Sequence, residues 1–302
     1  MGRRPGYDAE AYGGSRTPPG KMYMPAPMPW FPWLVPLFVI ANVAMFCIEM
    51  YVNDCPSRLD PDDCLFYSTL GRLSFQPFNE NRLLGPSEVT LIELGALQRD
   101  AVLKHGEEWR LLSCIWLHGG AIHLLANMLS LMLVGVRHEQ EFGFHRIGPL
   151  YVLSGLSGSL LSCLHLDVTK TSVGASGALF GLLGAMLSEL ITNWSIYANK
   201  CAAMMSLILI SGLNLAVGFL PGVDSYAHIG GFVSGFLLGF ILLMRPQYGY
   251  VNPKYISPGY SVKKKSKYNC FQYFFLATAT IIFLLGNMIG WIMLFKGGDN
   301  SI

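Results

Sequence analysis

Seven long apolar stretches alternate with shorter polar segments along this chain. A helix needs about 20 apolar residues to cross the hydrocarbon core of a bilayer, and Lys, Arg, Asp and Glu are almost absent from all seven stretches. The pattern predicts seven transmembrane helices, and Glu49 and Glu189, near the ends of two of them, are expected to reach the membrane interface. The predicted bounds are Phe31–Val52, Gly119–Val136, Ile147–His165, Ser172–Asn193, Cys201–Leu220, Tyr226–Met244 and Phe271–Phe295.

The polar segments divide the chain further. Residues 1–28 are rich in Gly, Pro, Arg and Tyr and lack apolar periodicity, which predicts a disordered basic tail and not a cleavable signal peptide. Residues 29–245 are predicted to form a core of six transmembrane helices, within which 53–118 is a long external loop. A basic loop over 246–270 then leads to the seventh helix and a short tail, 271–302.

Lysine and arginine are unevenly distributed between the loops. Cytoplasmic loops carry an excess of these residues, and here the loops on the same side as the N-terminal tail carry nearly all of them. We therefore predict a cytoplasmic N-terminus and a luminal or external C-terminus. The cluster of Lys263, Lys264, Lys265 and Lys267 is interpreted as a contact for anionic lipids or as a simple topology signal.

The composition favours a surface that faces lipid. Hydrophobic residues make up 52% of the 302 residues and charged residues 13%, whereas about 25% of a soluble domain is charged. The net charge of +2 gives no reason to expect nucleic acid as a partner. The seven cysteines include no C-x-x-C pair. Cys55 and Cys64 flank a polar turn, and they can pair if that turn lies in an oxidising lumen.

Polar side chains of three predicted helices share one end of the bundle. The second, fourth and sixth helices all enter from the external side, with His118, His123 and Asn127 around the start of the second. Ser176 falls in the first turn of the fourth helix and His228 in the first turn of the sixth. At 1.5 Å per residue, these groups lie within about 10 Å of the external boundary. Water can reach that depth through a cavity that opens outward.

Ser176 and His228 are candidates for a nucleophile and its base. A serine hydroxyl is a weak nucleophile and needs a base within hydrogen-bond reach, so the two helices must pack closely. Glycines at helical spacing allow such an approach. They are Gly177, Gly181 and Gly184 on the fourth helix and Gly231, Gly235 and Gly239 on the sixth. In the alternative interpretation these glycines only pack helices, and Ser176 is a small packing residue.

A second copy of the G-x-S-G pattern includes Ser157 in the third helix. This serine falls near mid-membrane, where no histidine or asparagine is expected at the same depth, and we interpret it as a packing residue. His123 and Asn127 are spaced i,i+4, so both project from one face of the second helix. With the backbone N–H of Ser176 they can form an oxyanion hole, in which one side-chain donor contributes about 10²–10³ in rate. Interhelical hydrogen bonding is their alternative role.

No third catalytic residue is evident. Asp224 precedes His228 by four residues and is interpreted as a solvated turn residue, so a Ser-His dyad is preferred. A metal is disfavoured, because His118 and His123, spaced i,i+5, diverge on a helix and no carboxylate accompanies them. Trp109 is interpreted as an interfacial anchor.

Two further charged residues remain. Arg110 can bind backbone carbonyls or lipid phosphate. Glu139 follows the second helix and is expected to brace a loop.

Taken together, these motifs resemble those of rhomboid intramembrane serine proteases over about Phe31–Arg245. The stretches Ser74–Phe78 and Asn81–Ser87, with the seventh helix, look like the plant-type secretory-pathway branch, which has a six-plus-one arrangement. The motifs that carry the resemblance are Trp109-Arg110, His118 with His123, Asn127, Glu139-x-x-x-Gly143, Gly174-Ala175-Ser176-Gly177 and Ala227-His228-Ile229-Gly230-Gly231.

The resemblance implies a role for each matching residue. Ser176 would be the nucleophile, His228 the general base, and His123, Asn127 and the Ser176 amide the oxyanion hole. Phe180 stands where many relatives have tyrosine, and it can still stack on His228. By the same resemblance, Trp109 and Arg110 would belong to an external loop that lies partly in the membrane, and Glu139 to a structural brace.

We therefore expect an all-α polytopic membrane protein with a rhomboid-like six-helix core and a seventh transmembrane helix. The implied activity is that of an intramembrane serine endopeptidase that cleaves single-span membrane proteins near the external end of their helices through an acyl-enzyme. No cofactor or metal is expected, and the partners are substrates and membrane lipids. The expected location is the secretory pathway, in the Golgi. The alternatives are a non-proteolytic rhomboid-like scaffold that binds membrane helices, and a transporter, which would need polar groups at mid-depth.

Overall fold

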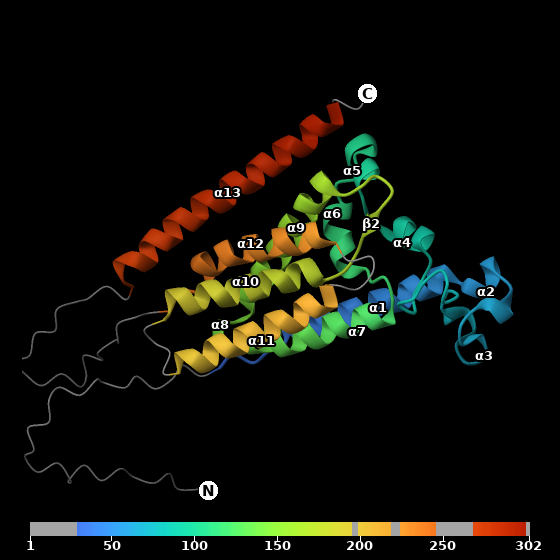
Figure 1. The fold of residues 1–302 in the computed structure, drawn as a ribbon, viewed down its shortest axis with the longest axis horizontal. Helices are drawn as coiled ribbons and strands as arrows, with labels where there is room; N and C mark the ends of the chain where they lie inside the picture. Colours follow the sequence, from blue (N-terminus) through green and yellow to red (C-terminus); the bar gives the residue numbers. More distant parts are fainter. Residues whose placement is uncertain (1–28, 195–198, 219–223, 246–267, 300–302) are drawn as a thin grey trace, which may run out of the picture.

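The computed structural model describes residues 29–194, 199–218, 224–245 and 268–299, which form a bundle of long helices with smaller elements gathered at one end (Figure 1). The all-α class predicted from the sequence is confirmed. The predicted basic tail (1–28) and lysine cluster (Lys263–Lys267) lie outside the described residues. The long elements are α1 (Leu34–Asn53), α7 (Ala121–Ser130), which continues through the π-helical η4 (Leu131–Gly135) into α8 (Val136–Phe142), α9 (Phe144–His165), α10 (Ser176–Thr192), α11 (Lys200–Gly218), α12 (Ser225–Leu242) and α13 (Cys270–Asp299).

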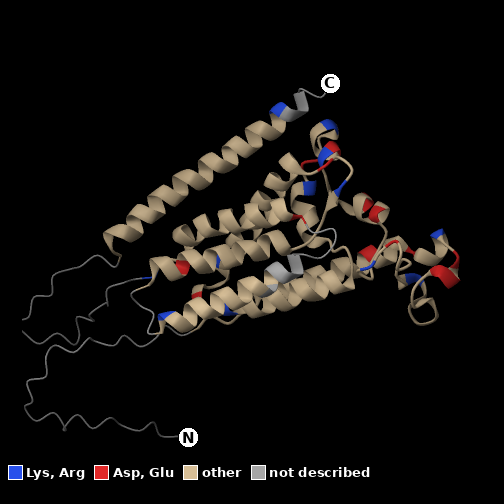
Figure 2. Ribbon diagram, in the orientation of Figure 1, with Lys and Arg blue, Asp and Glu red and all other residues tan. Residues whose placement is uncertain are grey.

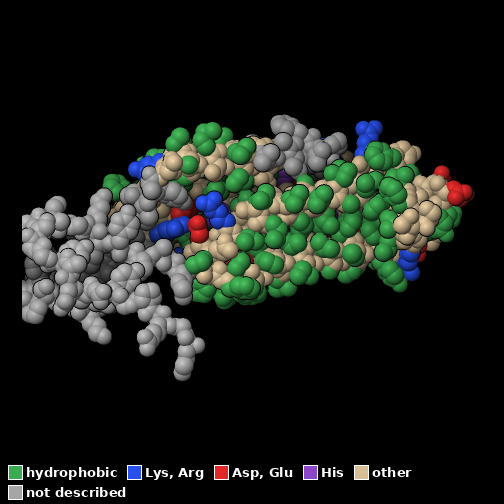
Figure 3. Space-filling view, turned by 90° about the horizontal axis from the view of Figure 1, so that it is seen from below, with side chains coloured by type: hydrophobic (Ala, Val, Ile, Leu, Met, Phe, Trp, Pro, Cys, Tyr) green, Lys and Arg blue, Asp and Glu red, His purple; other side chains and the backbone are tan. Residues whose placement is uncertain are grey.

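The helices carry the apolar surface of a polytopic membrane protein. By length and composition, five helical segments can cross a membrane, and α10 and the residues Lys200–Gly212 of α11 are shorter apolar helices. Lys, Arg, Asp and Glu gather at the two ends of the bundle and leave its middle almost uncharged (Figure 2). Hydrophobic side chains cover most of one flank (Figure 3). The five segments are Leu34–Arg58, Ala121–Phe142, Phe144–His165, Ser225–Leu242 and Cys270–Lys296.

Helix α10 is shorter than predicted and lies at the centre. The expected start at Ser172 is wrong, because Thr171–Ser172 forms strand β2, Gly174 has a φ of +124°, and the helix begins at Ser176. Its 17 residues extend about 25 Å, which is less than the roughly 30 Å of a bilayer's hydrocarbon core. Helix α10 is therefore too short to span the whole hydrocarbon core by itself.

The two faces of small residues lie directly against each other. A Cβ added to Gly231 would overlap the carbonyl oxygen of Gly177, and one added to Gly235 would overlap that of Gly181. A Cβ on Gly239 would lie 2.8 Å from the Cα of Ala185. Backbones that approach this closely leave no room for any side chain, so α10 and α12 pack backbone to backbone along their length.

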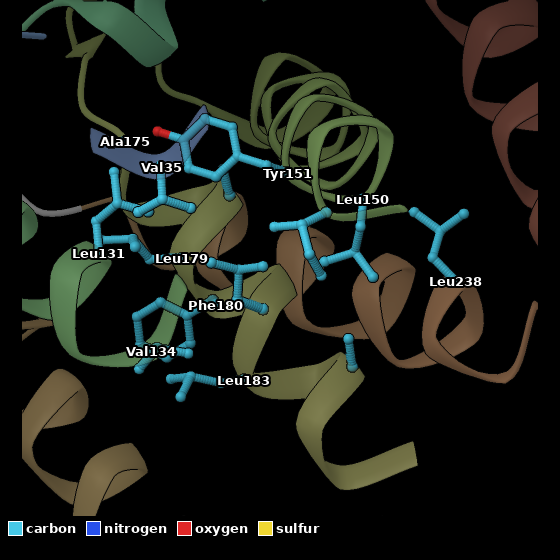
Figure 4. Packing of buried hydrophobic residues seen from close by; sticks show 14 of the residues in the cluster. Val35, Leu131, Val134, Leu150, Tyr151, Ala175, Leu179, Phe180, Leu183 and Leu238 are labelled. Atoms are coloured by element: carbon cyan, nitrogen blue, oxygen red, sulfur yellow. The ribbon is translucent and has the colours of Figure 1, made fainter. Parts of the chain in front are cut away.

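The opposite faces of α10 are surrounded by apolar side chains. Leu179 and Leu183 of α10 are buried among residues of α1, η4, α9 and α12, including Leu131 and Leu238 (Figure 4). Tyr151 of α9 is fully buried in the same cluster. Close packing from several helices therefore fixes the position of α10 and of the residue at its N-terminus.

The smaller elements form a cap, and we call this end of the bundle the capped end. The structure joins Cys55 and Cys64 in a disulfide. Asn53, at the end of α1, accepts hydrogen bonds through Oδ1 from Gln76, Ser87 and Thr90, which fastens the cap to α1. The elements of the cap are α2 (Cys55–Arg58), η1 (Pro61–Asp63), α3 (Tyr67–Leu70), η2 (Gly71–Leu73), α4 (Glu88–Leu94), β1 (Leu97–Gln98), α5 (Arg99–His105), α6 (Arg110–Ser113), η3 (Cys114–Trp116) and β2 (Thr171–Ser172).

Three polar residues differ from their predicted environments. Glu49 is completely buried, and Glu189 is buried in an ion pair with Arg245 at 3.1 Å, so both carboxylates face the interior of the protein and not its surface. Ser157 does more than fill space, because its hydroxyl donates to Oδ1 of Asn287 in α13 at 2.9 Å. Polar side chains in a membrane protein find partners inside the bundle where they have no water.

Candidate active site

The hydroxyl of Ser176 and the imidazole of His228 meet at the capped end of the bundle. Ser176 is the first residue of α10, His228 is the fourth of α12, and Ser176 Oγ lies 2.8 Å from His228 Nε2. The contact follows from the glycine packing described above, because Gly177 lies directly after Ser176 and Gly231 lies three residues after His228. A histidine within hydrogen-bond reach is the arrangement that activates a serine as a nucleophile.

Asp224 fixes the N-terminus of α12, where His228 is located. Its side chain accepts hydrogen bonds from the backbone N–H groups of Tyr226 and Ala227, and the hydroxyl of Ser162 in α9 donates to the same carboxylate. Asp224 is therefore a helix cap that also ties α12 to α9, in addition to being a partly exposed residue before the helix. Within the described ranges, no carboxylate side chain hydrogen-bonds the imidazole of His228.

Phe180 covers the imidazole of His228. The two rings are stacked, with centroids 4.2 Å apart and planes inclined by 16°. Phe180 lies four residues after Ser176 on α10, so both side chains project from one face of the helix. One helix face therefore contacts both the edge and the plane of the imidazole.

His123 and Asn127 lie beside the segment that leads into Ser176. Both are buried on α7. A Cβ added to Gly174 would lie 2.7 Å from Cε1 of His123 and 3.5 Å from Nδ2 of Asn127, so the chain passes directly over both side chains. In the part of the chain that the structure describes, Nδ2 of Asn127 has no hydrogen-bond partner. The first N–H groups of α10 also have no partner within the helix, so donors from two elements converge here.

His118 does not lie on a helix with His123. It precedes α7, and its ring packs edge to face against that of His123, with centroids 5.4 Å apart. Its backbone N–H donates to the carboxylate of Glu49. The expected divergence of the two rings is therefore wrong, and a carboxylate does lie nearby, although it contacts only the backbone of His118. Within the described ranges, no group of three or more His, Cys, Asp or Glu side chains is placed to hold a metal ion. Burial and the nearby His123 ring lower the pKa of His118 to about 3, so this imidazole is neutral at pH 7.

A cavity of about 770 Å³ lies at the capped end and reaches His123. Asn81, Gly119, Val173 and Asp224 also line it. Its walls come from the cap, from the segment before α10 and from the N-terminus of α12. Water can therefore approach the histidine from this end of the bundle.

Arg110 and Glu139 both bind backbone groups. The guanidinium of Arg110 donates to the carbonyls of Ile92 and Ala96 at 2.7 and 3.0 Å, which matches the first of its two expected roles. Trp109 beside it is half exposed. Glu139 accepts hydrogen bonds from three consecutive N–H groups, Trp33 to Val35, at the start of α1. Glu139 therefore caps the N-terminus of α1 and holds the residue that precedes it, which agrees with the expected structural brace.

Sequence reasoning did not find two of the contacts around this site. Asp224 with Ser162 joins α12 to α9, and Glu49 with His118 joins α1 to the start of α7. Glu49 carries a signal that is visible in the sequence, because an acidic residue within an apolar stretch is a functional candidate by default. The contact of Ser162 with Asp224 has no comparable signal, since serine is common in membrane helices.

Comparisons with known proteins identify the family of this chain. The family described as "Rhomboid domain" matches residues 105–245. RHOMBOID-like protein 5 of Arabidopsis thaliana is 61% identical over 300 residues, which cover 98% of this chain and 96% of that protein. RHOMBOID-like protein 1 of the same plant is 56% identical over 271 residues, 89% of this chain and 69% of that protein.

One relative bears on activity. A protein named inactive RHOMBOID-like protein 8, also from Arabidopsis thaliana, is 44% identical over 223 residues, 74% of this chain and 63% of that protein. Family membership alone therefore does not establish catalysis. Because RHOMBOID-like protein 5 is 61% identical over nearly the whole chain, this multi-pass membrane protein belongs to the rhomboid family, and its relatives indicate a function of the intramembrane protease type.

Proposed function

We propose that this protein is an intramembrane serine endopeptidase in which Ser176 is the nucleophile and His228 the general base. The observation that carries the proposal is the 2.8 Å separation of Ser176 Oγ and His228 Nε2 at the N-terminal ends of two helices that pack backbone to backbone. In this proposal residues 29–245 form the catalytic core, and the seventh helix, in 271–302, takes no part in the chemistry.

The reaction proceeds in two halves. Ser176 Oγ attacks the carbonyl carbon of the substrate peptide bond while Nε2 of His228 takes the hydroxyl proton. The negative charge on the carbonyl oxygen is stabilised by donors from Asn127, His123 and the first N–H groups of α10. Collapse of the tetrahedral intermediate breaks the C–N bond, and the departing amine receives the proton from His228. A water molecule from the cavity then attacks the carbonyl carbon of the acyl-enzyme and gives a proton to Nε2 of His228. Collapse of the second tetrahedral intermediate breaks the ester C–O bond, returns that proton to Ser176 Oγ and releases the carboxylic acid.

Single-span membrane proteins are the proposed substrates. The site lies near one end of the bundle, so the bond that is cut lies near the corresponding end of the substrate helix. A carbonyl inside a helix is engaged in a hydrogen bond and must be freed before attack. Glycine costs about 1 kcal/mol and proline about 3 kcal/mol in a helix interior, so helix-weakening residues near the cut favour cleavage. We place the capped end in the lumen of the secretory pathway, in the Golgi, and the N-terminus in the cytoplasm.

The test is cleavage of a co-expressed single-span reporter with a glycine near the luminal end of its helix. Wild type is expected to release the reporter's luminal domain, and Ser176→Ala and His228→Ala to lose roughly 10⁴-fold or more in rate. Ser157→Ala is the matched control, because Ser157 has the same local G-x-S-G sequence but lies on α9, and it is expected to cleave. Reaction with a fluorophosphonate probe should require both Ser176 and His228.

Equal cleavage by wild type and Ser176→Ala would contradict the enzymatic assignment. Binding of membrane helices without any Ser176-dependent cleavage would instead favour a non-proteolytic scaffold.

A further inference from the structure

We propose that Glu49 of α1 is a positioning residue for the oxyanion hole, and that it acts through His118 on the imidazole of His123. The inference rests on the proposed function. It assigns a role in the reaction to α1, a helix from which sequence reasoning took no site residue.

Glu49 is buried and forms no ion pair with any residue that the structure describes. It is 0% exposed, and its Oε1 accepts a hydrogen bond from the backbone N–H of His118 at 3.0 Å. Among the described residues, its Oε2 has no hydrogen-bond partner. Burying a carboxyl group in this way costs free energy, and a buried ionisable residue in a membrane helix is usually retained for function. The group it contacts therefore indicates what it does.

The contact holds the turn that precedes α7. Leu117 is fully buried on one side of His118. On the other side, the carbonyl of Gly119 accepts a hydrogen bond from Nδ2 of Asn81 at 2.8 Å. The backbone N–H of Ala121 donates to the carbonyl of Leu84 at 2.7 Å. The cap thus holds the turn from one side, and Glu49 holds it from the last turns of α1.

The side chain of His118 transmits this position to His123. Its ring is 0% exposed and packs edge to face on the ring of His123, with an angle of 61° between the planes. The backbone of Trp116 lies close to the ring. Neither ring nitrogen, however, makes a hydrogen bond of normal geometry to a described residue. The orientation of His118 is therefore set by its backbone and its packing, and Glu49 controls that backbone.

The position of His123 matters because an oxyanion donor must point at a small target. A misplacement of about 1 Å can cost roughly 10²-fold in rate. His123 makes no side-chain hydrogen bond with a described residue, and Gly174 passes over it. The packed ring of His118 therefore limits the rotation of the His123 side chain. Glu49, His118 and His123 form a row that leads from α1 to the reacting atoms.

The first experiment is a double-mutant cycle between Glu49→Leu and His123→Ala, measured on the purified full chain with the single-span reporter. Glu49→Leu is expected to lower kcat roughly 10- to 100-fold, with little change in KM. In the His123→Ala background the same substitution should have no further effect on kcat, because it acts through the residue already removed. Glu49→Gln retains an acceptor oxygen for the His118 N–H and is expected to restore most of kcat.

A second pair of variants leaves the Glu49 contact intact and serves if Glu49→Leu fails to fold. His118→Phe keeps a ring against His123 and should retain most of kcat, whereas His118→Ala should lose it, with both variants assayed well below their Tm because the deleted ring leaves a cavity. Additive effects of Glu49→Leu and His123→Ala, or equal activity of His118→Ala and His118→Phe, would overturn the inference. Neither result would contradict the proposed protease function. That function would be contradicted if wild-type cleavage did not depend on Ser176.

Discussion

The phenyl ring of Phe180 lies flat against the imidazole of His228, with ring centroids 4.2 Å apart. The same imidazole contacts Ser176 Oγ through its edge. Because Ser176 and Phe180 are one helical turn apart on α10, the helix that supplies the hydroxyl also fixes the plane of the ring that meets it. The geometry of the pair is thus a property of one helix face and not of a flexible loop.

Removal of the stacked ring should therefore impair the reaction more than substrate binding. Phe180→Ala leaves His228 free to rotate, and we expect kcat to fall roughly 10-fold or more while KM changes little. Phe180→Tyr keeps the aromatic face and should retain activity. Steady-state cleavage of the single-span reporter measures both values. A loss in KM alone would show that Phe180 contacts substrate instead.

The backbone contact between α10 and α12 predicts a sharp difference between two glycines. In Gly231→Ala the new methyl group would overlap the carbonyl of Gly177, so the helices must separate and Ser176 must move away from His228. Such overpacking costs about 1–3 kcal/mol, and we expect a large loss of kcat and of fluorophosphonate labelling. Gly286→Ala on α13 meets open space and should be neutral. Equal effects of the two substitutions on activity would contradict this account.

Asp224 offers a test of how the general base is held. Asp224→Asn preserves a side-chain oxygen that can cap α12, whereas Asp224→Ala removes the cap, at a cost of about 1 kcal/mol. We expect Asp224→Ala to lower both Tm and kcat, and Asp224→Asn to stay close to wild type. Ser162→Ala removes the tie to α9 alone. Thermal unfolding and cleavage are measured on the same samples. If Asp224 were a third catalytic residue beside Ser176 and His228, Asp224→Asn would lose activity at an unchanged Tm.

Much of this arrangement is visible in the sequence for a physical reason. Consecutive membrane helices alternate in direction, so the parity of a helix tells at which end Ser176 and His228 lie. Glycines such as Gly231 and Gly235 at four-residue spacing then identify the helix faces that approach each other. The order of the helices therefore predicts the end of the bundle at which the two residues lie, and the glycine spacing predicts which helix faces meet.

The contacts that escape prediction depend on residues far apart in the chain. Strand β2 exists because Thr171 and Ser172 pair with Gln98 and Leu97, more than seventy residues earlier, and local hydrophobicity instead extends the helix to Ser172. The i,i+5 spacing suggests that His118 shares a helix with His123, although the turn before α7 separates them. Such pairings depend on tertiary structure, which periodicity does not encode.

Gly174 provides the most direct test of the approach to the oxyanion hole. Its φ of +124° is unfavourable for a residue with a side chain, and its Cβ would lie 2.7 Å from Cε1 of His123. Gly174→Ala should therefore displace both the donor and the segment that leads into Ser176, and we expect loss of cleavage and of fluorophosphonate labelling. Gly71, with a φ of +53° and open space around it, is the matched control for backbone strain alone.

Strain of this kind costs about 1–3 kcal/mol, so both Gly71→Ala and Gly174→Ala should lower Tm, and Gly174→Ala should lower it more because its methyl group also overlaps His123. Only Gly174→Ala should abolish activity, because only Gly174 lies against His123 and Asn127. A Gly174→Ala variant that still cleaves the reporter at the wild-type rate would show that the oxyanion forms elsewhere. The roles proposed for His123 and Asn127 would then have to be abandoned, even if Ser176 and His228 kept theirs.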